Sequence, residues 1–324
     1  MILQIAKWLL LLIAFKLIVA LVVAQCYTDP RRDITARKKH LSAFNPNVVF
    51  IGTSRTLYGI DPALFDSLNH QKTRSYNFGI FSLSPYSAIQ LASDMLTENP
   101  GVTTIYIELS ALEYSTVALQ PQEVIPDAVF RAQVMSDAPA IGTSEKIGSF
   151  LSGLNTTLFQ MVSIAPQILS AKKAIKPEND PVEGNADLHA NGHQSVAGAL
   201  PATNERIIAN KTSTEAMPAI HKPAAPNAFY LAQLSGLVAR ARQQGKQVIF
   251  YYPNSITAAE QRVLAQVAPF LPDAQCIPLP APPLLDSLFT PGNLFDAHHL
   301  NQRGASAYTR FFREEAAKRI SVNR

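Results

Sequence analysis

Short apolar runs recur along the chain, and each is followed by a turn-forming residue or by a helical pattern. The first covers residues 47–51, Asn-Val-Val-Phe-Ile, and leads into Gly52-Thr53-Ser54. A continuous apolar run that ends in glycine is typical of a strand buried in a parallel sheet. The same pattern predicts further strands at residues 74–78, 103–109, 247–252 and 275–279.

Amphipathic segments separate these strands and predict helices. The predicted helices cover residues 85–98, 227–244, 258–270 and 302–320, with a shorter one that begins at Asp61-Pro62. Strands that alternate with helices indicate a parallel sheet covered on both faces. We therefore predict an α/β fold: a three-layer α/β/α domain over residues 46–324, with a roughly five-stranded parallel sheet.

A long region interrupts this alternation. Residues 112–171 are moderately apolar and predict helices, whereas residues 172–226 are rich in Ala, Pro, Asn and His and show little periodicity. A segment that buries little apolar surface does not offset the entropy lost on ordering it. We therefore expect an insertion over about residues 112–226, whose second part is an irregular and partly disordered lid.

The beginning of the chain is its most apolar part. Residues 8–26 carry a single charge, Lys16, and roughly 20 apolar residues suffice to cross a bilayer. This length favours an uncleaved transmembrane signal anchor over residues 1–27, although Ala24 also fits a signal peptide that is cut nearby. Residues 28–45 are polar and predict a juxtamembrane linker.

The 324-residue chain has a net charge of +4, and basic residues gather after the apolar segment. These are Arg31, Arg32, Arg37, Lys38 and Lys39. We expect them to meet anionic lipid headgroups, because no basic patch with interleaved aromatic residues indicates binding to nucleic acid. The positive-inside rule would place the domain in the cytoplasm, but long domains translocate despite such flanks.

Metal and redox chemistry find little support in the sequence. The two cysteines, Cys26 and Cys276, make no disulfide framework, and Cys276 is expected to be a buried, inert thiol. His189 and His193 have a spacing seen in metal sites, but no cluster of cysteines or carboxylates accompanies them. We expect neither a metal nor a cofactor.

Two motifs, far apart in the sequence, carry the candidate chemistry. Ser54 follows the first predicted strand, and reactive groups in open α/β sheets collect at the carboxyl ends of strands. Asp296 and His299 lie just before the last predicted helix. Each motif alone also fits an ordinary turn or helix entry. Together they predict a catalytic triad, because a histidine that activates a serine needs an acceptor for its other ring nitrogen.

The spacing within the second motif distinguishes two neighbouring histidines. In a turn that leads into a helix, residues three apart lie on the same side, so Asp296 is expected to orient His299. His298 would then point toward solvent or the lid. Leu300 is expected to anchor the loop in the core, and Asn301 to cap the last helix.

These residues resemble the sequence blocks of SGNH (GDSL-like) hydrolases. The matching segments are Val49-Phe50-Ile51-Gly52-Thr53-Ser54-Arg55, Tyr76-Asn77-Phe78-Gly79 and Asp296-x-x-His299-Leu300-Asn301-x-x-Gly304. The pattern looks like the membrane-anchored bacterial branch, which is similar to alginate O-acetylation and teichoic-acid D-alanylation proteins. The resemblance covers the core strands and the last helix. It implies a domain on the periplasmic or outer side of an inner membrane, with the amides of Ser54 and Gly79 holding an oxyanion.

One block of that family is missing. Where a Gly-x-Asn-Asp stretch would follow the third strand, the chain has Ile107-Glu108-Leu109-Ser110. The absent Asn would donate to the oxyanion, and losing one such donor typically costs about 10²- to 10³-fold in rate. Asn77, Arg55 and Asn254 are candidate replacements, and Arg55 could instead position an anionic group or pair with Glu108.

The resemblance implies a serine acyltransferase or esterase that acts, through an acyl-enzyme, on O-acyl groups of an envelope or exported polysaccharide. A membrane protein that donates the acyl group would be its partner. The alternative is a non-catalytic envelope factor that binds polysaccharide or assists assembly and keeps the fold with a decayed site. The missing block favours the alternative, and the intact Ser54, Asp296 and His299 favour the enzyme.

Overall fold

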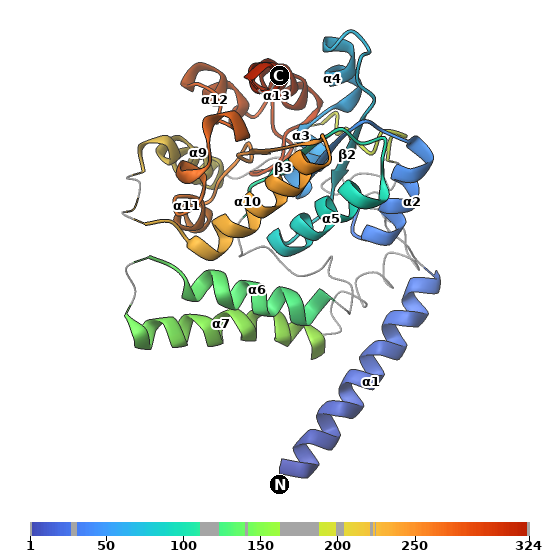
Figure 1. Cartoon of the computed structure of the whole chain (residues 1–324), viewed down its shortest axis with the longest axis vertical. Helices are drawn as coiled ribbons and strands as arrows, with labels where there is room; N and C mark the ends of the chain where they lie inside the picture. The colour runs from blue at the N-terminus through green and yellow to red at the C-terminus, as the bar shows by residue number, and fades with distance from the viewer. Residues whose placement is uncertain are drawn as a thin grey trace.

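The computed structural model describes residues 2–26, 31–110, 123–139, 142–162, 188–198, 204–220, 223 and 225–322 of the chain. Its centre is a parallel β-sheet surrounded by helices, and the long helix α1 (Ile2–Cys26) extends away from the sheet and touches the rest of the molecule at α7 (Thr143–Val162) (Figure 1). The two parts correspond to the apolar segment and the α/β domain that the sequence pattern predicts.

Within the described residues, the sheet has five parallel strands in the order β2-β1-β3-β4-β5. The strands are β1 (Val48–Gly52), β2 (Ser75–Gly79), β3 (Thr104–Glu108), β4 (Gln247–Tyr251) and β5 (Cys276–Ile277). All five coincide with runs predicted from the sequence, which confirms the parallel α/β sheet. Gly52 pairs with Gly79, so the carboxyl ends of β1 and β2 lie side by side.

Several helices flank the sheet, and most of them follow the sequence pattern. They are α3 (Ser54–Gly59), α4 (Pro62–Leu68), α5 (Pro85–Glu98), α10 (Ala228–Gln243), α11 (Ala258–Leu264), α12 (Pro282–Leu288) and α13 (Gln302–Val322), with 3-10 turns η4 (Ala268–Phe270) and η5 (Asp273–Gln275). The bounds of α5 equal the predicted ones, because Ser84 caps its first turn and Pro85 begins it. The short helices α3 and α12 are not predicted.

Side chains of β1 alternate between two hydrophobic clusters. Val49 and Ile51 pack with residues of α5 and α10. Val48 and Phe50 pack with residues of α4, α12 and α13. A strand that is apolar on both faces lies in the interior of an α/β fold, which explains why its sequence is continuously apolar rather than alternating.

The predicted juxtamembrane linker is wrong for residues 34–44, which form the helix α2 (Ile34–Phe44). The Asp33 carboxylate caps its first turn by accepting from two backbone N–H groups, and Asn45 ends it in the left-handed conformation. The hydrophobic pattern misses this helix because one of its buried residues is a charged one, Arg37.

Arg37 joins three parts of the fold. Its side chain is fully buried, and Nη2 donates to the carbonyl oxygens of Asn77 at 2.8 Å, Gly79 at 3.1 Å and Gly192 at 2.6 Å. Asn77 and Gly79 belong to β2, and Gly192 belongs to the insertion. The helix α2 is therefore fixed to the domain at the end of β2.

Most residues of the basic cluster contact the domain, which the sequence pattern did not predict. Arg31 is buried, as Arg37 is. Lys38 forms an ion pair with Asp94 of α5 at 2.7 Å. The Arg32 guanidinium lies over the ring of Phe81, 4.6 Å from its centroid. These contacts arise because α2 packs on the domain instead of extending from it.

The insertion contains more regular structure than its sequence pattern predicts. As expected, its first part is helical, with α6 (Val124–Ser136) and α7 (Thr143–Val162) side by side below α5 and α10 (Figure 1). The irregular lid predicted over residues 172–226 is wrong for α9 (Asn204–Ala216) and the 3-10 turn η3 (Met217–Ala219). Residues 188–198 include the buried His193. Residues 172–187 lie outside the described part of the chain.

Among the described helices, α1 alone is long and apolar enough to span a membrane by length and composition. Its apolar window, Ile2–Val19, is not buried in the rest of the molecule. A helix of 25 residues is about 37 Å long, and the hydrocarbon core of a bilayer is about 30 Å thick. By length and composition, α1 is therefore a candidate membrane span.

Candidate active site

Ser54 begins α3 directly after β1. Thr53 is the N-cap residue, and its hydroxyl accepts from the N–H of Arg55 at 3.3 Å. Ser54 therefore occupies the first helical position, where a backbone N–H has no partner inside the helix. In the described part of the chain this N–H has no other hydrogen-bond acceptor either.

Ser54, His299 and Asp296 form a continuous hydrogen-bonded chain. The Ser54 hydroxyl lies 2.8 Å from Nε2 of His299, although 245 positions separate the two residues. Nδ1 of His299 lies 2.7 Å from Oδ2 of Asp296. With a proton on Nδ1, His299 donates to Asp296 and accepts from Ser54 at Nε2. The structure thus brings together the three residues of the expected triad.

A tight loop holds Asp296 and His299. Leu294 and Leu300 form an antiparallel bridge across it, and Oδ1 of Asp296 accepts from two backbone N–H groups, including that of His299 at 2.8 Å. Leu300 is buried, and Oδ1 of Asn301 accepts from two N–H groups in the first turn of α13. These contacts confirm Leu300 as an anchor of the loop and Asn301 as a helix cap.

Asp296 is suited to orient His299 because it remains ionised. Burial of the carboxyl raises its pKa, but the hydrogen bond and charge of His299 and the two backbone N–H groups outweigh burial, and the pKa falls to about 2. Asp296 is thus a carboxylate at neutral pH. A carboxylate at this place keeps the proton on Nδ1 and leaves Nε2 free to accept.

Aromatic side chains fix the plane of the His299 ring. Phe295 stacks on it with ring centroids 5.5 Å apart, and Tyr58 meets it edge-on at 5.2 Å. Phe295 and Tyr58 also contact each other and are almost fully buried. Packing on two sides holds the ring in the orientation that directs Nε2 at Ser54.

His298 is bonded to α9 of the insertion. Nη2 of Arg206 lies 2.7 Å from its Nε2, and the side chain of Asn210 donates to the carbonyl oxygen of Ala297 at 2.6 Å. Burial, followed by the charges of His299 and Arg206, lowers the pKa of His298 to about 4. His298 thus faces the insertion, as predicted, and α9 holds the loop that carries the triad histidine.

Gly79 does not offer the free amide that the resemblance implies. Its N–H donates to Oδ1 of Asn77 at 2.8 Å. The side-chain amide of Asn77 donates in turn to the carbonyl oxygens of Thr56 and Ile60, both at 2.7 Å. A Cβ at Gly79 would collide with the backbone of Leu57. Asn77 and Gly79 therefore hold α3 against β2, and neither is placed to donate a hydrogen bond to an oxyanion.

The other two candidate donors are also engaged away from the Ser54 hydroxyl. Arg55 is buried and pairs with Glu108 and Glu260, each at 2.9 Å. Asn254 is buried against Gly59, at the end of α3 opposite the serine.

The sequence suggested that Arg55 could pair with Glu108, which the structure confirms, but it did not reveal the rest of the buried polar network beneath Ser54. It consists of Glu108 with Thr53, Thr56 and Tyr251, in addition to Arg55. One signal was present in the sequence: Glu108 ends an otherwise apolar strand, and a buried carboxylate requires several donors around it.

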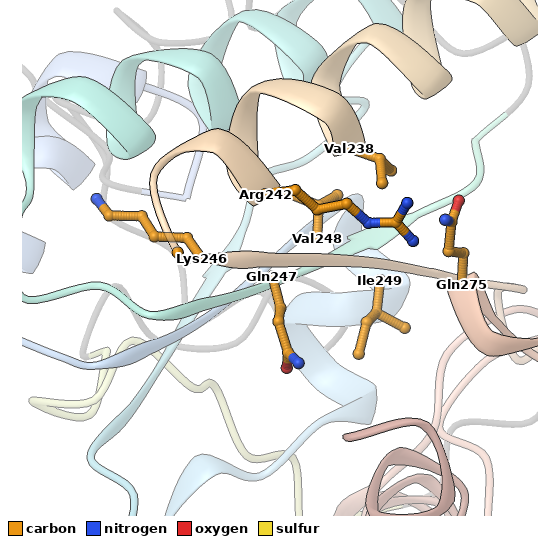
Figure 2. A pocket seen from close by; sticks show the side chains of 8 residues that line it. Val238, Arg242, Lys246, Gln247, Val248, Ile249 and Gln275 are labelled. Atoms are coloured by element: carbon orange, nitrogen blue, oxygen red, sulfur yellow. The ribbon is translucent and has the colours of Figure 1, made fainter. Parts of the chain in front are cut away.

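A cavity of about 290 Å³ lies at the amino-terminal end of the strands, where β4 begins (Figure 2). Its lining includes the polar side chains of Arg242, Gln247 and Gln275. The strand β4 runs from this cavity to Tyr251, which pairs with Glu108 at the edge that carries the serine. The cavity is therefore separate from the candidate active site.

The structure also shows the surroundings of the two histidines considered as metal ligands and of the cysteine Cys276. His189 and His193 stack with ring centroids 5.9 Å apart, and among the described residues no group of three or more His, Cys, Asp or Glu side chains could hold a metal ion. Cys276 is a buried free thiol, and burial raises its pKa to about 12. This confirms that Cys276 is buried, and a raised pKa disfavours the thiolate, which is the reactive form.

The chain matches no protein-family model, and comparisons with curated proteins and with solved structures show no significant similarity. Its class must therefore be inferred from the residues themselves. A serine, a histidine and a carboxylate are linked by consecutive hydrogen bonds at the carboxyl ends of the strands of a parallel sheet. That arrangement is typical of a serine nucleophile activated by a general base.

Proposed function

We propose that the chain is a membrane-anchored serine acyltransferase or esterase of the SGNH kind, acting on O-acyl groups of an envelope or exported polysaccharide. The observation that best supports this proposal is the pair of hydrogen bonds that links Ser54 to His299 and His299 to Asp296. The two hydrophobic clusters beside the sheet support the three-layer α/β/α arrangement of that family. The helix α1 supports the anchor, and the proposed location of the domain is the periplasm or outer side of an inner membrane.

In the first half of the reaction His299 acts as a general base. Its Nε2 takes the proton of the Ser54 hydroxyl as Oγ attacks the acyl carbonyl carbon. Asp296 stabilises the imidazolium that forms. The tetrahedral intermediate then collapses, the imidazolium gives its proton to the leaving oxygen, and the acyl group remains as an ester on Ser54.

In the second half another oxygen nucleophile releases the acyl group. His299 takes a proton from water or from a sugar hydroxyl as that oxygen attacks the acyl carbon. The proton returns to Oγ of Ser54 when the ester bond breaks. Water gives hydrolysis and a sugar hydroxyl gives O-acyl transfer. We favour transfer, because an anchored domain suits a polysaccharide acceptor and a membrane protein as acyl donor.

The proposed oxyanion donor is the backbone N–H of Ser54, which has no acceptor in the described part of the chain. The N–H of Gly79 is bonded to Asn77 and is not proposed as the second donor. A site that lacks one donor is expected to be about 10²- to 10³-fold slower than a site with both. Slow turnover is therefore part of the proposal.

The test uses purified full-length protein, a fluorophosphonate probe and an aryl acetate. We expect wild type to be labelled and to hydrolyse the ester, and Ser54→Ala and His299→Ala to lose turnover. Asp296→Asn should keep the fold and lose about 10³- to 10⁴-fold in kcat, because an amide permits the wrong tautomer of His299. His298→Ala is the matched control and should keep most of the activity.

Circular dichroism separates loss of chemistry from loss of fold. A folded wild type that is neither labelled nor active would show that the enzyme proposal is wrong. The non-catalytic polysaccharide-binding factor would then be the better account, and the occupied amide of Gly79 already favours it. If His298→Ala is inactive and His299→Ala is active, the assignment of the base is wrong.

A further inference from the structure

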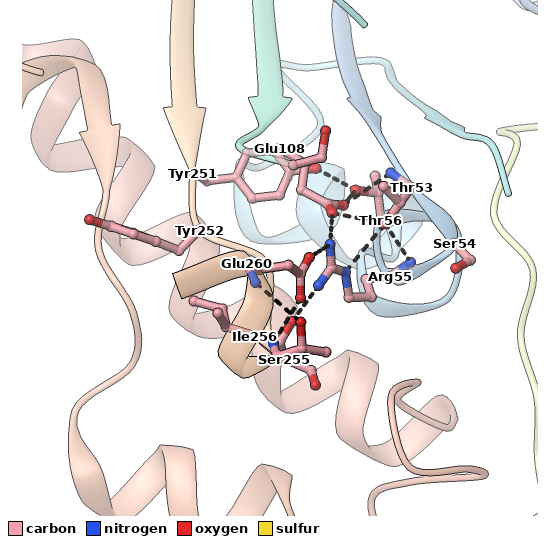
Figure 3. A network of polar contacts seen from close by, with 12 residues as sticks. Thr53, Ser54, Arg55, Thr56, Glu108, Tyr251, Tyr252, Ser255, Ile256 and Glu260 are labelled. Carbon is pink, nitrogen blue, oxygen red and sulfur yellow. Dashed lines mark hydrogen bonds and ion pairs between the residues drawn. The ribbon is translucent and has the colours of Figure 1, made fainter. Parts of the chain in front are cut away.

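The side chains at the start of α3 have two different partners. Figure 3 shows Thr53, Arg55 and Thr56 bonded around Glu108, with Ser54 turned away from it. Ser54 is bonded to the triad histidine, whereas Thr53, Arg55 and Thr56 are all bonded to Glu108. Glu108 is the last residue of β3 and is 2% exposed. Ser54 is therefore the one residue of this turn whose side chain is directed away from the buried carboxylate.

The Glu108 carboxylate accepts four hydrogen bonds. Oε1 accepts from the Thr53 hydroxyl at 2.8 Å and from Nη2 of Arg55 at 2.9 Å. Oε2 accepts from the Thr53 N–H at 3.1 Å and from the Thr56 hydroxyl at 2.5 Å. A carboxylate offers about four lone-pair sites, so these donors occupy its full capacity. All four come from residues that flank Ser54, on both sides of it.

A second carboxylate binds Arg55 from another direction. Nη2 of Arg55 also lies 2.9 Å from Oε1 of Glu260, and both side chains are buried. Within the described residues, no hydrogen bond joins Glu260 to Thr53 or Thr56. The two carboxylates thus share Arg55, but Glu108 is the one that touches the turn around the serine.

The network is closely packed. The space among Arg55, Glu108 and Tyr251 is too small for a water molecule. A Cβ at Gly52 would collide with the Thr56 hydroxyl and lie 2.6 Å from Oε2 of Glu108, so only glycine fits at the end of β1. Where no water fits between the groups, each buried polar group depends on its protein partners for stabilisation, and small displacements are costly.

We propose that Glu108 is the positioning residue of Ser54: its carboxylate holds the turn that presents the Ser54 hydroxyl to His299 and leaves the Ser54 N–H unbonded. This inference rests on the proposed function. It gives a role to the strand end at which the family resemblance fails, because the residue there binds the nucleophile turn instead of the substrate. Since Glu108 acts through Thr53, Arg55 and Thr56, it affects the chemical step and not substrate binding.

Glu108→Gln tests this role, with Glu260→Gln as the matched control. Glutamine keeps the shape of the side chain, but its amide nitrogen would face N–H and hydroxyl donors that need an acceptor. We expect Glu108→Gln to lower kcat for an aryl acetate by about 10²-fold, with KM unchanged, because small misplacements of reacting groups cost about that much. Glu260→Gln should keep most of kcat.

A second measurement does not depend on catalysis. Hydrogen–deuterium exchange over residues 53–59 should become about 10-fold faster in Glu108→Gln, because the Thr53 N–H loses its carboxylate acceptor and the turn opens more often. Exchange in Glu260→Gln should stay at the wild-type rate. Thr56→Val keeps the side-chain shape, removes one donor to Glu108 and should show a smaller change in the same direction.

Equal effects of the two glutamine variants on kcat and on exchange would overturn the proposal, because Glu108 would then be no more than one of two counterions of Arg55. If wild type has no esterase activity, the proposed function fails, and the exchange rates alone decide the positioning role. If Glu108→Gln does not fold, Thr56→Val decides: a lower kcat at constant KM supports the proposal, and unchanged kcat and exchange reject it.

Discussion

Adjacent histidines in this chain have opposite environments. His299 is bonded through Nδ1 to the ionised Asp296, which leaves Nε2 directed at Ser54. His298 is bonded to the guanidinium of Arg206, and its pKa is lowered to about 4 by burial and by neighbouring positive charges. A ring that stays neutral well below pH 7 is poorly suited to take a proton from a serine. At the residue scale, the different partners of the two histidines favour His299 over His298 as the proposed general base.

His193 gives a prediction for stability against pH. Burial, with the charges of His189 and Arg37, outweighs Asp61 and the Tyr58 carbonyl and lowers the pKa of His193 to about 4. An unfolded histidine titrates near 6.5. As the pH falls from about 6.5 to about 4, the unfolded chain therefore binds a proton that the folded chain does not. The free energy of unfolding should fall by up to about 3 kcal/mol over this range.

Urea denaturation at about pH 7 and about pH 4 measures that fall. His193→Gln should reduce it, and the part that remains should come from His298, His40 and Glu315, whose pKa values are also lowered. The control is His70→Asn: His70 is exposed at a φ of 55°, a conformation that Asn adopts readily. An identical fall in wild type and His193→Gln would contradict the prediction.

At the scale of elements, the close packing of α3 against β2 depends on the absence of a side chain at Gly79. A Cβ there would lie 2.5 Å from Cα of Leu57 and closer still to its backbone nitrogen. Backbone atoms cannot move aside as a flexible side chain does, so α3 must shift. Gly79→Ala should therefore cost about 3 kcal/mol of stability and, by moving Ser54 away from His299, lower activity.

The control for that variant is Gly236→Ala in α10. Nothing lies within 4 Å of a Cβ added at Gly236. Alanine in a helix interior is more favourable than glycine by about 1 kcal/mol, so this variant should be slightly more stable than wild type and fully active. Thermal denaturation and ester turnover compare the pair. Equal stability of the two variants would mean that α3 is free to adjust.

The strands and long helices were predictable because each has a local pattern. The run that forms β1 is apolar on both faces, and α5 has a serine cap, a proline at its start and an apolar stripe. The helix α2 lacks such a pattern, since the residue it buries most deeply is Arg37. The partners of Arg37 are 40 to 155 positions away, and no local rule reveals them.

The candidate triad was predictable for a different reason. Ser54 lies in a strand-to-helix turn, and Asp296 and His299 share one loop, so each half is visible locally. The supports of the triad are not visible in this way. Glu108 binds residues 52 to 55 positions away, and its four contacts exist only after β1 and β3 have paired. Long-range polar networks of this kind need the fold before they can be recognised.

At the scale of the whole molecule, Arg37 connects α2, the helix that follows the candidate membrane span, to the end of β2 beside the candidate active site. Arg37→Met would leave the carbonyl oxygens of Asn77, Gly79 and Gly192 without this donor. A buried acceptor that loses its partner costs about 1–3 kcal/mol. We therefore expect a loss of roughly 3 kcal/mol or more in the free energy of unfolding, measured by urea denaturation of the full chain.

Lys39→Met is the matched control for that variant. Lys39 lies on the same helix, is exposed and carries the same charge. Its replacement should change stability by less than about 0.5 kcal/mol. A similar loss in both variants would indicate that positive charge on α2, and not the bonds of Arg37 to the sheet, stabilises the domain.

The docking of α2 shortens the tether between α1 and the domain. Five Cα-to-Cα steps separate the end of α1, Cys26, from the buried Arg31, and five steps extend at most about 18 Å. With α1 embedded in a bilayer, the serine can move only within a thin shell beside the lipid surface. Its rate of encounter with substrate would then depend on how many substrate chains occupy each unit area of membrane, and not on their bulk concentration.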